Sequence, residues 1–179
     1  MPDVPPSPRP RPRWRRWALE VLIVLVALAA FQLWQLRDAV RGPAPAVAGE
    51  RLDGSPFDLA AWRAGQHGRA TLLYFWAEWC PICKTTAGNV TAVTEDWPVT
   101  SVASQSGPAA QVAGHLRAAG HSWPTLADPR ADILRRFGVP GVPAFVVIDP
   151  RGDVRFVTLG YTSEIGLRLR LWWATWSGA

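Results

Sequence analysis

Two cysteines are the residues whose type and spacing could do chemistry. Cys80 and Cys83 are the only cysteines and stand two residues apart, in the segment Trp79-Cys80-Pro81-Ile82-Cys83. A thiolate can attack a disulfide, and a second thiol nearby can then release the product, so this spacing permits disulfide exchange. The same two sulfurs could instead bind Cu(I), which prefers soft ligands, or form a static disulfide.

A buried strand and a helix start are expected to position the pair. Thr71 to Phe75 is a short apolar run, rich in aromatics, that is typical of a buried strand. Pro81 suits the first position of a helix, where its missing N–H costs nothing. A sulfur at a helix N-terminus faces unpaired N–H groups and the positive end of the dipole, which favours its thiolate. We therefore expect Cys80 to be the nucleophile and Cys83, one turn further on and more buried, to be the resolving thiol.

The other uses of the pair are less favoured. A disulfide that closes so small a loop constrains the unfolded chain only slightly, which argues against a purely structural bridge. The intact cysteine pair argues against a binding module that keeps the fold without turnover. A four-ligand zinc site would need a second pair, and His67, His115 and His121 lack the spacing of metal ligands. We expect no metal and no cofactor beyond the redox-active disulfide. Copper binding or delivery stays the alternative function, with His115 or His121 as a possible further ligand.

Strand-like and helix-like segments alternate around the pair. A hairpin is expected around Asp53-Gly54. The remaining expected elements are strands at 98–104, 144–148 and 154–159 and helices at 109–119 and 131–137. The last two strands are joined by the turn residues at 149–152. This order predicts an α/β domain with a mixed central sheet flanked by helices.

The last segment carries large apolar residues at helical spacing. They are Ile165, Leu169, Trp172, Trp173 and Trp176. A helix that covers a sheet needs such a face, so we expect this stripe to lie in the core.

The net charge of +5 belongs mainly to the N-terminus. From Pro43 onward 12 Lys or Arg face 11 Asp or Glu, whereas five arginines lie among the first 16 residues. The rest of the chain is nearly neutral, so nucleic-acid binding is not expected. Residues 1–16, with their many prolines, are expected to be a basic, disordered cytoplasmic tail.

Residues 17–36 are expected to be a transmembrane anchor. This segment contains an unbroken apolar run from Val21 to Phe31, and as a helix it would span roughly 30 Å, the thickness of a bilayer core. The preceding arginines favour a cytoplasmic N-terminus and a single pass through the inner membrane. A linker is then expected at residues 37–48 and a periplasmic domain at residues 49–179. The alternative is a cleaved signal peptide with Ala46-Val47-Ala48 at the cleavage site, although that site lies far beyond the apolar run.

The sequence resembles the thioredoxin superfamily. Phe75-Trp76-Ala77-Glu78-Trp79-Cys80 through Lys84 is similar to the active-site segment of that superfamily. Leu52-Asp53-Gly54 with Phe57 and Leu59 resembles the hairpin that opens its TlpA-like branch, and Gly138-Val139-Pro140-Gly141-Val142-Pro143 resembles the proline loop of that branch. With an N-terminal anchor, the likeness is to the periplasmic TlpA/DsbE group, and within it to the ScsD-like members associated with copper tolerance. The resemblance covers about residues 47–176 and implies a thioredoxin-like fold.

The resemblance also implies roles and partners. Val142-Pro143 is implied to be a cis peptide bond beside the cysteines, with the backbone of Val142 pairing with a partner chain; Trp79 joins them as a substrate-binding residue. The implied partners are exported cysteine-containing proteins and a membrane electron donor of the DsbD/ScsB type. Copper chaperones of this fold usually separate their cysteines by three residues, which differs from the spacing here.

Several positions depart from the family pattern and could tune the site. Tyr74 occupies the position of the buried acid that aids proton transfer in thioredoxins, so the proton acceptor stays open; Glu78 lies near, but we expect it to be a solvated loop carboxylate. Pro81-Ile82 lacks the histidine of strongly oxidising relatives, which favours a reductant or electron carrier over a strong oxidant. Ala144 replaces the Glu that cytochrome c maturation relatives usually carry, which weakens a role in apocytochrome reduction.

Overall fold

The computed structural model describes residues 13–178 and divides into two compact units after Gln35. The first unit contains the helix α1 (Arg13–Gln35). No helix in the described part of the chain is both long enough and apolar enough to cross a membrane, so the anchor expected at residues 17–36 is not supported. Most of the expected tail lies outside the described residues, and residues 13–16 belong to α1.

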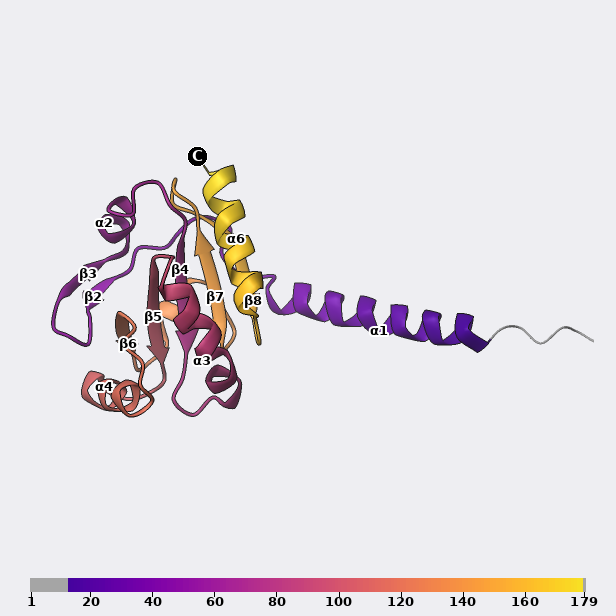
Figure 1. Ribbon diagram of the computed structural model, residues 1–179, viewed down its shortest axis with the longest axis horizontal. Coiled ribbons are helices and arrows are strands. Elements are labelled where there is room, and N and C mark those ends of the chain that lie inside the picture. The colour runs from indigo at the N-terminus through magenta and orange to yellow at the C-terminus, as the bar shows by residue number, and fades with distance from the viewer. Residues whose placement is uncertain (1–12, 179) are drawn as a thin grey trace, which may run out of the picture. The chain divides into compact units, whose positions relative to one another are not determined.

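The second unit is built on a six-stranded mixed sheet (Figure 1). In spatial order its strands are β1 (Gly42–Pro43), β8 (Asp153–Leu159), β7 (Ala144–Ile148), β4 (Thr71–Trp76), β5 (Val99–Ser104) and β6 (Thr125–Asp128). The strands β4, β5 and β6 are parallel, whereas β7 runs antiparallel to β4 and to β8. Every residue of β4, β5 and β7 is buried, as expected for central strands covered on both faces.

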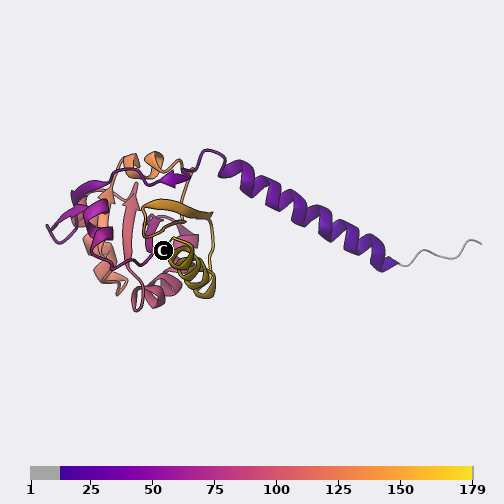
Figure 2. The same cartoon turned by 90° about the horizontal axis from the view of Figure 1, so that it is seen from above.

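Two helical layers cover the sheet (Figures 1 and 2). One face packs against α3 (Pro81–Thr94), α4 (Ala109–Ala118) and α6 (Glu164–Ser177). The other face packs against α2 (Leu59–Ala64), α5 (Asp132–Arg136) and the hairpin of β2 (Ala48–Glu50) and β3 (Pro56–Asp58). The mixed sheet and its two layers confirm the expected α/β architecture.

Most of the expected elements are present within one or two residues. The hairpin around Asp53-Gly54, the strands at 71–75, 98–104, 144–148 and 154–159, and the helices at 109–119 and 131–137 are all confirmed. Three short elements, β1, β6 and α2, were not expected. None exceeds six residues, and so none is long enough to show a clear periodicity.

The linker expected at residues 37–48 is instead part of the folded unit. Ala39 and Val47 are buried. The amide of Val40 donates to the carbonyl of Phe137 at 3.0 Å, and Gly42-Pro43 pairs with β8 at the edge of the sheet. Prolines and small residues suggested a solvated spacer, but the apolar side chains between them find partners on the domain. The described fold therefore begins at Leu36 rather than at residue 49.

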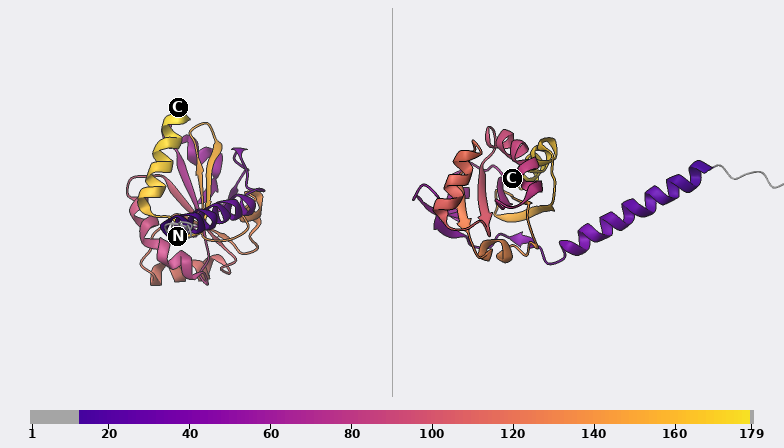
Figure 3. Two further views of the ribbon diagram at one scale, coloured as in Figure 1. Left: turned by 90° about the vertical axis from the view of Figure 1, so that its right-hand side faces the viewer. Right: turned by 90° about the horizontal axis from the view of Figure 1, so that it is seen from below.

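The aromatic stripe of α6 does not lie in the core. Leu167, Leu171 and Ala174 are fully buried and face the sheet, where α6 lies along β7 (Figure 3). The expected core residues are exposed by 49 to 71%: Ile165, Leu169, Trp172, Trp173 and Trp176. This helix is apolar on two opposite faces, so periodicity alone could not decide which one the sheet would bury.

Candidate active site

The two cysteines form a disulfide at the first turn of α3. Their Cα atoms lie 5.3 Å apart. Cys80 is the N-cap residue, and its sulfur accepts a hydrogen bond from the amide of Cys83 at 3.1 Å. Pro81 occupies the first turn, as expected from its missing N–H. The buried strand β4 therefore delivers the pair to a helix N-terminus, where backbone N–H groups stabilise a thiolate on Cys80.

Burial does not distinguish the two sulfurs in this oxidised pair. Cys80 is 4% exposed and Cys83 is 3% exposed, so the expected difference in burial is not seen. The distinction comes from the helix geometry, because the sulfur of Cys80 receives the amide of Cys83.

The proline loop lies against the disulfide. Among the described residues, Val142-Pro143 is the one cis peptide bond, which agrees with the choice of Pro143 over Pro140. The carbonyl oxygen of Val142 lies 3.8 Å from the sulfur of Cys80. The carbonyl of Pro143 accepts the amide of Gly160 at 2.8 Å, which ties the loop to the segment after β8. The structure thus brings Cys80 together with Val142, which is 62 positions away in sequence, and with the adjacent Pro143.

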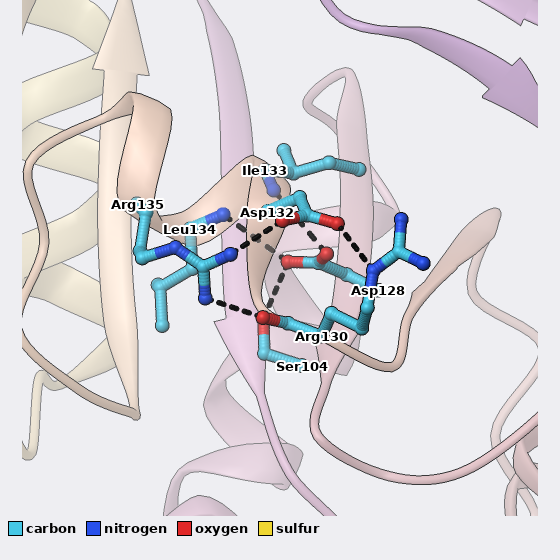
Figure 4. Close-up of polar contacts among 7 residues, drawn as sticks. All are labelled: Ser104, Asp128, Arg130, Asp132, Ile133, Leu134 and Arg135. Atoms are coloured by element: carbon cyan, nitrogen blue, oxygen red, sulfur yellow. Dashed lines mark hydrogen bonds and ion pairs between the residues drawn. The ribbon is translucent and has the colours of Figure 1, made fainter.

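A buried carboxylate that the sequence did not reveal fixes the helix leading into this loop. The Asp128 carboxylate accepts the amides of Ile133 at 3.2 Å and Leu134 at 3.1 Å, and the hydroxyl of Ser104 at 3.3 Å (Figure 4). These contacts join the end of β6 to the start of α5. The chain then reaches the proline loop through Gly138, whose positive φ of 64° lets the backbone of Asp38 approach closely.

Tyr74 fills the position of the thioredoxin acid without supplying a base. Its hydroxyl lies 3.2 Å from the Thr86 hydroxyl and donates to the carbonyl of Cys83 at 3.4 Å. Its ring stacks on Phe145 with centroids 5.0 Å apart. Burial raises the pKa of Tyr74 to about 12, so the phenol stays protonated at neutral pH.

Glu78 is held by α4 instead of being a freely solvated loop carboxylate. Its side chain accepts a hydrogen bond from the Gln111 amide at 3.0 Å and lies 3.9 Å from Nδ1 of His115. Its amide donates to the hydroxyl of Ser106 at 3.0 Å. The carboxylate is therefore positioned over the helix beside the active site, with about a third of the side chain still exposed.

Two large side chains border the disulfide on the surface. Trp79 is 60% exposed, and its indole N–H donates to the carbonyl of Gln105 at 3.0 Å. Ile82 is about half exposed in the first turn of α3. Together with the half-buried Val142 they bring apolar surface and accessible backbone close to the two sulfurs, which suits contact with an extended peptide.

A cavity of about 170 Å³ lies behind Cys83. Its lining includes Tyr74, Cys83, Lys84, His115 and His121. Burial lowers the pKa of His121, with His115 as a second cause. Both imidazoles thus share a cavity with Cys83, which the sequence spacing did not reveal. No cluster of three or more His, Cys, Asp or Glu side chains able to hold a metal ion occurs in the part of the chain that the structure describes.

Known proteins are similar to this chain in sequence and in fold. The model of the AhpC/TSA family matches residues 40–157. The chain is 33% identical over 128 residues to a thioredoxin-like protein of Haemophilus influenzae, covering 71% of this chain and 74% of the relative.

Two solved structures extend the likeness. A thiol:disulfide interchange protein of the thioredoxin family from Chlorobium tepidum is 25% identical, with a TM-score of 0.64 over 77% of this chain and 99% of that one. A secreted disulfide oxidoreductase of Mycobacterium tuberculosis, described as homologous to DsbE, is 26% identical, with a TM-score of 0.57 over 70% of this chain and 93% of that one. The cysteine pair at the start of α3, the fold and these relatives show that the chain belongs to the AhpC/TSA family and is a thiol-disulfide oxidoreductase with a thioredoxin-like fold.

Proposed function

We propose that the protein reduces, or passes electrons to, disulfides of exported proteins through Cys80 and Cys83. The observation that carries this proposal is the contact geometry of Cys80, whose sulfur accepts the Cys83 amide and lies beside the Val142 carbonyl. This geometry supports Cys80 as the nucleophile, because its sulfur lies at a helix N-terminus and next to backbone that can pair with a substrate strand.

The chemistry takes two exchange steps. The Cys80 thiolate attacks one sulfur of the substrate disulfide, whose S–S bond breaks and releases a substrate thiolate. The Cys83 thiolate then attacks Cys80 in the mixed disulfide and releases the second substrate thiolate, which takes up a proton. Two electrons pass to the substrate, and the pair ends as the disulfide seen in the structure.

The direction of electron flow follows from how well the Cys80 thiolate is stabilised. The donor placed on its sulfur is the backbone amide of Cys83, and neither Pro81 nor Ile82 has a polar side chain to add a second. A less stabilised thiolate makes the reduced pair a better electron donor. This favours a reductant or electron carrier over a strong oxidant.

We further propose that residues 17–36 anchor the protein in the inner membrane, with the N-terminus cytoplasmic and the domain periplasmic. The support is the apolar run from Val21 to Phe31 after five arginines, and a helix α1 whose exposed apolar side chains lie on all its sides. A membrane donor of the DsbD/ScsB type would then restore the reduced pair. The ScsD-like likeness is part of this proposal and rests on the sequence features alone.

Trapping mixed disulfides tests the function. In a Cys83→Ala strain, Cys80 should accumulate thiol-sensitive conjugates with envelope proteins, because the second step is removed. The matched control is Cys80→Ala, which keeps Cys83 and should trap far less. Finding no conjugates with Cys83→Ala would contradict the function, whereas equal trapping by both variants would contradict the assignment of the nucleophile.

Copper binding is the second candidate, because His115 and His121 line the same cavity as Cys83. Thiolates and imidazoles can both ligate copper. Tight, stoichiometric Cu(I) binding by the reduced protein, weakened by His115→Ala and combined with no disulfide exchange, would favour this function over the first.

A further inference from the structure

The outer face of α6 carries an exposed apolar strip. Five side chains, each exposed by 49% or more, form this strip, which we call the α6 stripe: Ile165, Leu169, Trp172, Trp173 and Trp176. They repeat at three- and four-residue intervals over about three turns, or roughly 16 Å of helix. The ring of Trp176 lies 6.3 Å from that of Trp172 and 6.0 Å from that of Trp173, so the indoles form one continuous patch.

The orientation of α6 is fixed, so the stripe cannot turn into the core. Leu167, Leu171 and Ala174 are fully buried on the opposite side of the helix. Arg168 binds the carboxylate of Glu164 at 2.7 Å, the carbonyl of Ala92 at 2.9 Å, and the carboxylate of Asp96. Rotating the stripe inward would expose three buried side chains and break the contacts with α3.

The aromatic end of the stripe lies away from the disulfide. The helix ends at Gly178, which packs directly against Asp149 and Pro150, the turn that follows β7. The catalytic proline loop joins the other end of β7, where Pro143 precedes Ala144. The five residues of β7, at about 3.3 Å each, separate the two ends. The stripe is therefore a surface distinct from the one that meets the reacting sulfurs.

The chemistry of the stripe matches a lipid headgroup region. Indole rings favour the boundary between water and hydrocarbon, because the ring is apolar and its N–H is polar. With about 3.6 residues per turn, Arg170 falls on one flank of the stripe, where basic residues of interfacial helices lie. On the other flank, Arg168 is paired with Glu164 and Asp96. Large aromatic residues beside a basic flank suit a helix lying in the plane of a membrane surface.

The chain also keeps the domain close to the proposed anchor. Only residues 36–38 separate the end of α1 from Ala39, which is buried in the domain. Four residue steps reach about 14 Å at most. If α1 is inserted, the domain therefore stays near the bilayer, and a lipid surface is available to the α6 stripe.

We propose that α6 lies on the membrane, with the α6 stripe inserted among the lipid headgroups. The proposal rests on the anchor that belongs to the proposed function. It gives the domain a second attachment, so the disulfide and its proline loop take a fixed orientation to the bilayer. A fixed orientation suits repeated reduction by a donor that is itself embedded in the membrane.

Site-specific fluorescence tests the contact on the full chain. An environment-sensitive fluorophore is attached at position 169 through Leu169→Cys, in a Cys80→Ser, Cys83→Ser background, and the protein is reconstituted in vesicles of phosphatidylethanolamine and phosphatidylglycerol. The matched control uses Arg130→Cys, an exposed position on the opposite side of the sheet. We expect blue-shifted emission at position 169, and quenching by lipids spin-labelled near the headgroup several-fold stronger than at position 130. Equal quenching at the two positions would overturn the proposal.

Two further measurements separate the remaining explanations. If a second copy of the chain covered the stripe, the shift at position 169 would persist in detergent and grow with protein concentration, which would also overturn the proposal. In the wild-type cysteine background, Trp172→Gln with Trp173→Gln and Trp176→Gln should leave exchange with a soluble disulfide substrate unchanged, because the stripe is remote from the sulfurs. Quenching at position 169 without any exchange by the wild type contradicts the proposed function alone, and exchange without quenching contradicts the membrane contact alone.

Discussion

Removing the carboxylate of Asp128 should weaken both the fold and the active-site loop. Asp128 is 3% exposed, and its carboxylate accepts three hydrogen bonds, two from backbone amides of α5 and one from Ser104. Asp128→Ala leaves the amides of Ile133 and Leu134 without an acceptor in a site that excludes water. Each unsatisfied buried donor costs about 1 to 3 kcal/mol. Because two amides are affected and the start of so short a helix can relax, we expect the free energy of unfolding to fall by about 2 to 4 kcal/mol.

Urea unfolding of matched variants measures this loss. Asp128→Asn keeps one side-chain oxygen as an acceptor, so it should lose roughly half as much stability as Asp128→Ala. Asp132→Ala is the control, because Asp132 lies in the same cluster (Figure 4) but forms exposed ion pairs with Arg130 and Arg135. Surface pairs contribute little, so this variant should unfold near the wild-type urea concentration. Equal losses for Asp128→Ala and Asp132→Ala would refute the reasoning.

The same variants should separate stability from activity. Since α5 leads through Gly138 into the proline loop, loosening α5 should slow exchange with a protein substrate under conditions where Asp128→Ala is still folded. Asp132→Ala should exchange at the wild-type rate. If Asp128→Ala is destabilised but exchanges normally, α5 does not position the loop.

Three further variants test other parts of the site. Tyr74→Phe should lose about 1 kcal/mol of stability but keep its exchange rate at neutral pH. Because the folded pKa of Tyr74 is raised from 10.0 to about 12, its contribution to stability is complete below pH 10 and is lost as the pH rises toward 12. Unfolding curves of the Phe variant should not show this loss. His121→Gln should make the free energy of unfolding depend less on pH on the acid side. Because the folded pKa of His121 is lowered, its contribution to stability is complete above pH 6.5 and is lost as the pH falls. Trp79→Ala should raise the KM for a protein substrate several-fold and leave the reduction of a small disulfide unchanged, since its indole is exposed beside the sulfurs.

The sequence predicted the elements that carry strong local signals. An apolar run, a cysteine pair and a proline at a helix start predicted β4 and the first turn of α3. These features are short in sequence and their physical causes are local. The cis bond at Val142-Pro143 beside Cys80 was implied by the resemblance to the thioredoxin superfamily. The contacts of Asp128 and the shared cavity of His115 and Cys83 depend on the packing of distant segments, so no spacing along the chain could reveal them.

The last helix shows a different limit. Its residues satisfy helical periodicity on two faces, one built from Leu167, Leu171 and Ala174 and the other from the α6 stripe. The sheet and α3 bury the face with the smaller side chains, because the space between packed layers does not accept three indoles. A prediction based on apolar size alone therefore chose the wrong face. Large aromatics at helical spacing next to a second apolar face are better taken as a sign of a surface with a partner.

Proton handling and electron flow have separate structural causes in this site. The Cys80 thiolate is stabilised by the Cys83 amide, which affects how easily the reduced pair gives up electrons. In the proposed exchange Cys83 must lose its proton before it can resolve the mixed disulfide, and Tyr74 cannot accept that proton because its own is held up to a pKa of about 12. Among the described residues, His115 and His121 line the cavity of Cys83 and carry imidazole nitrogens that can accept a proton, and Glu78 lies beside His115. A change at these residues should therefore alter the pH dependence of resolution while leaving the redox potential nearly constant, because the sulfur of Cys80 keeps its donor.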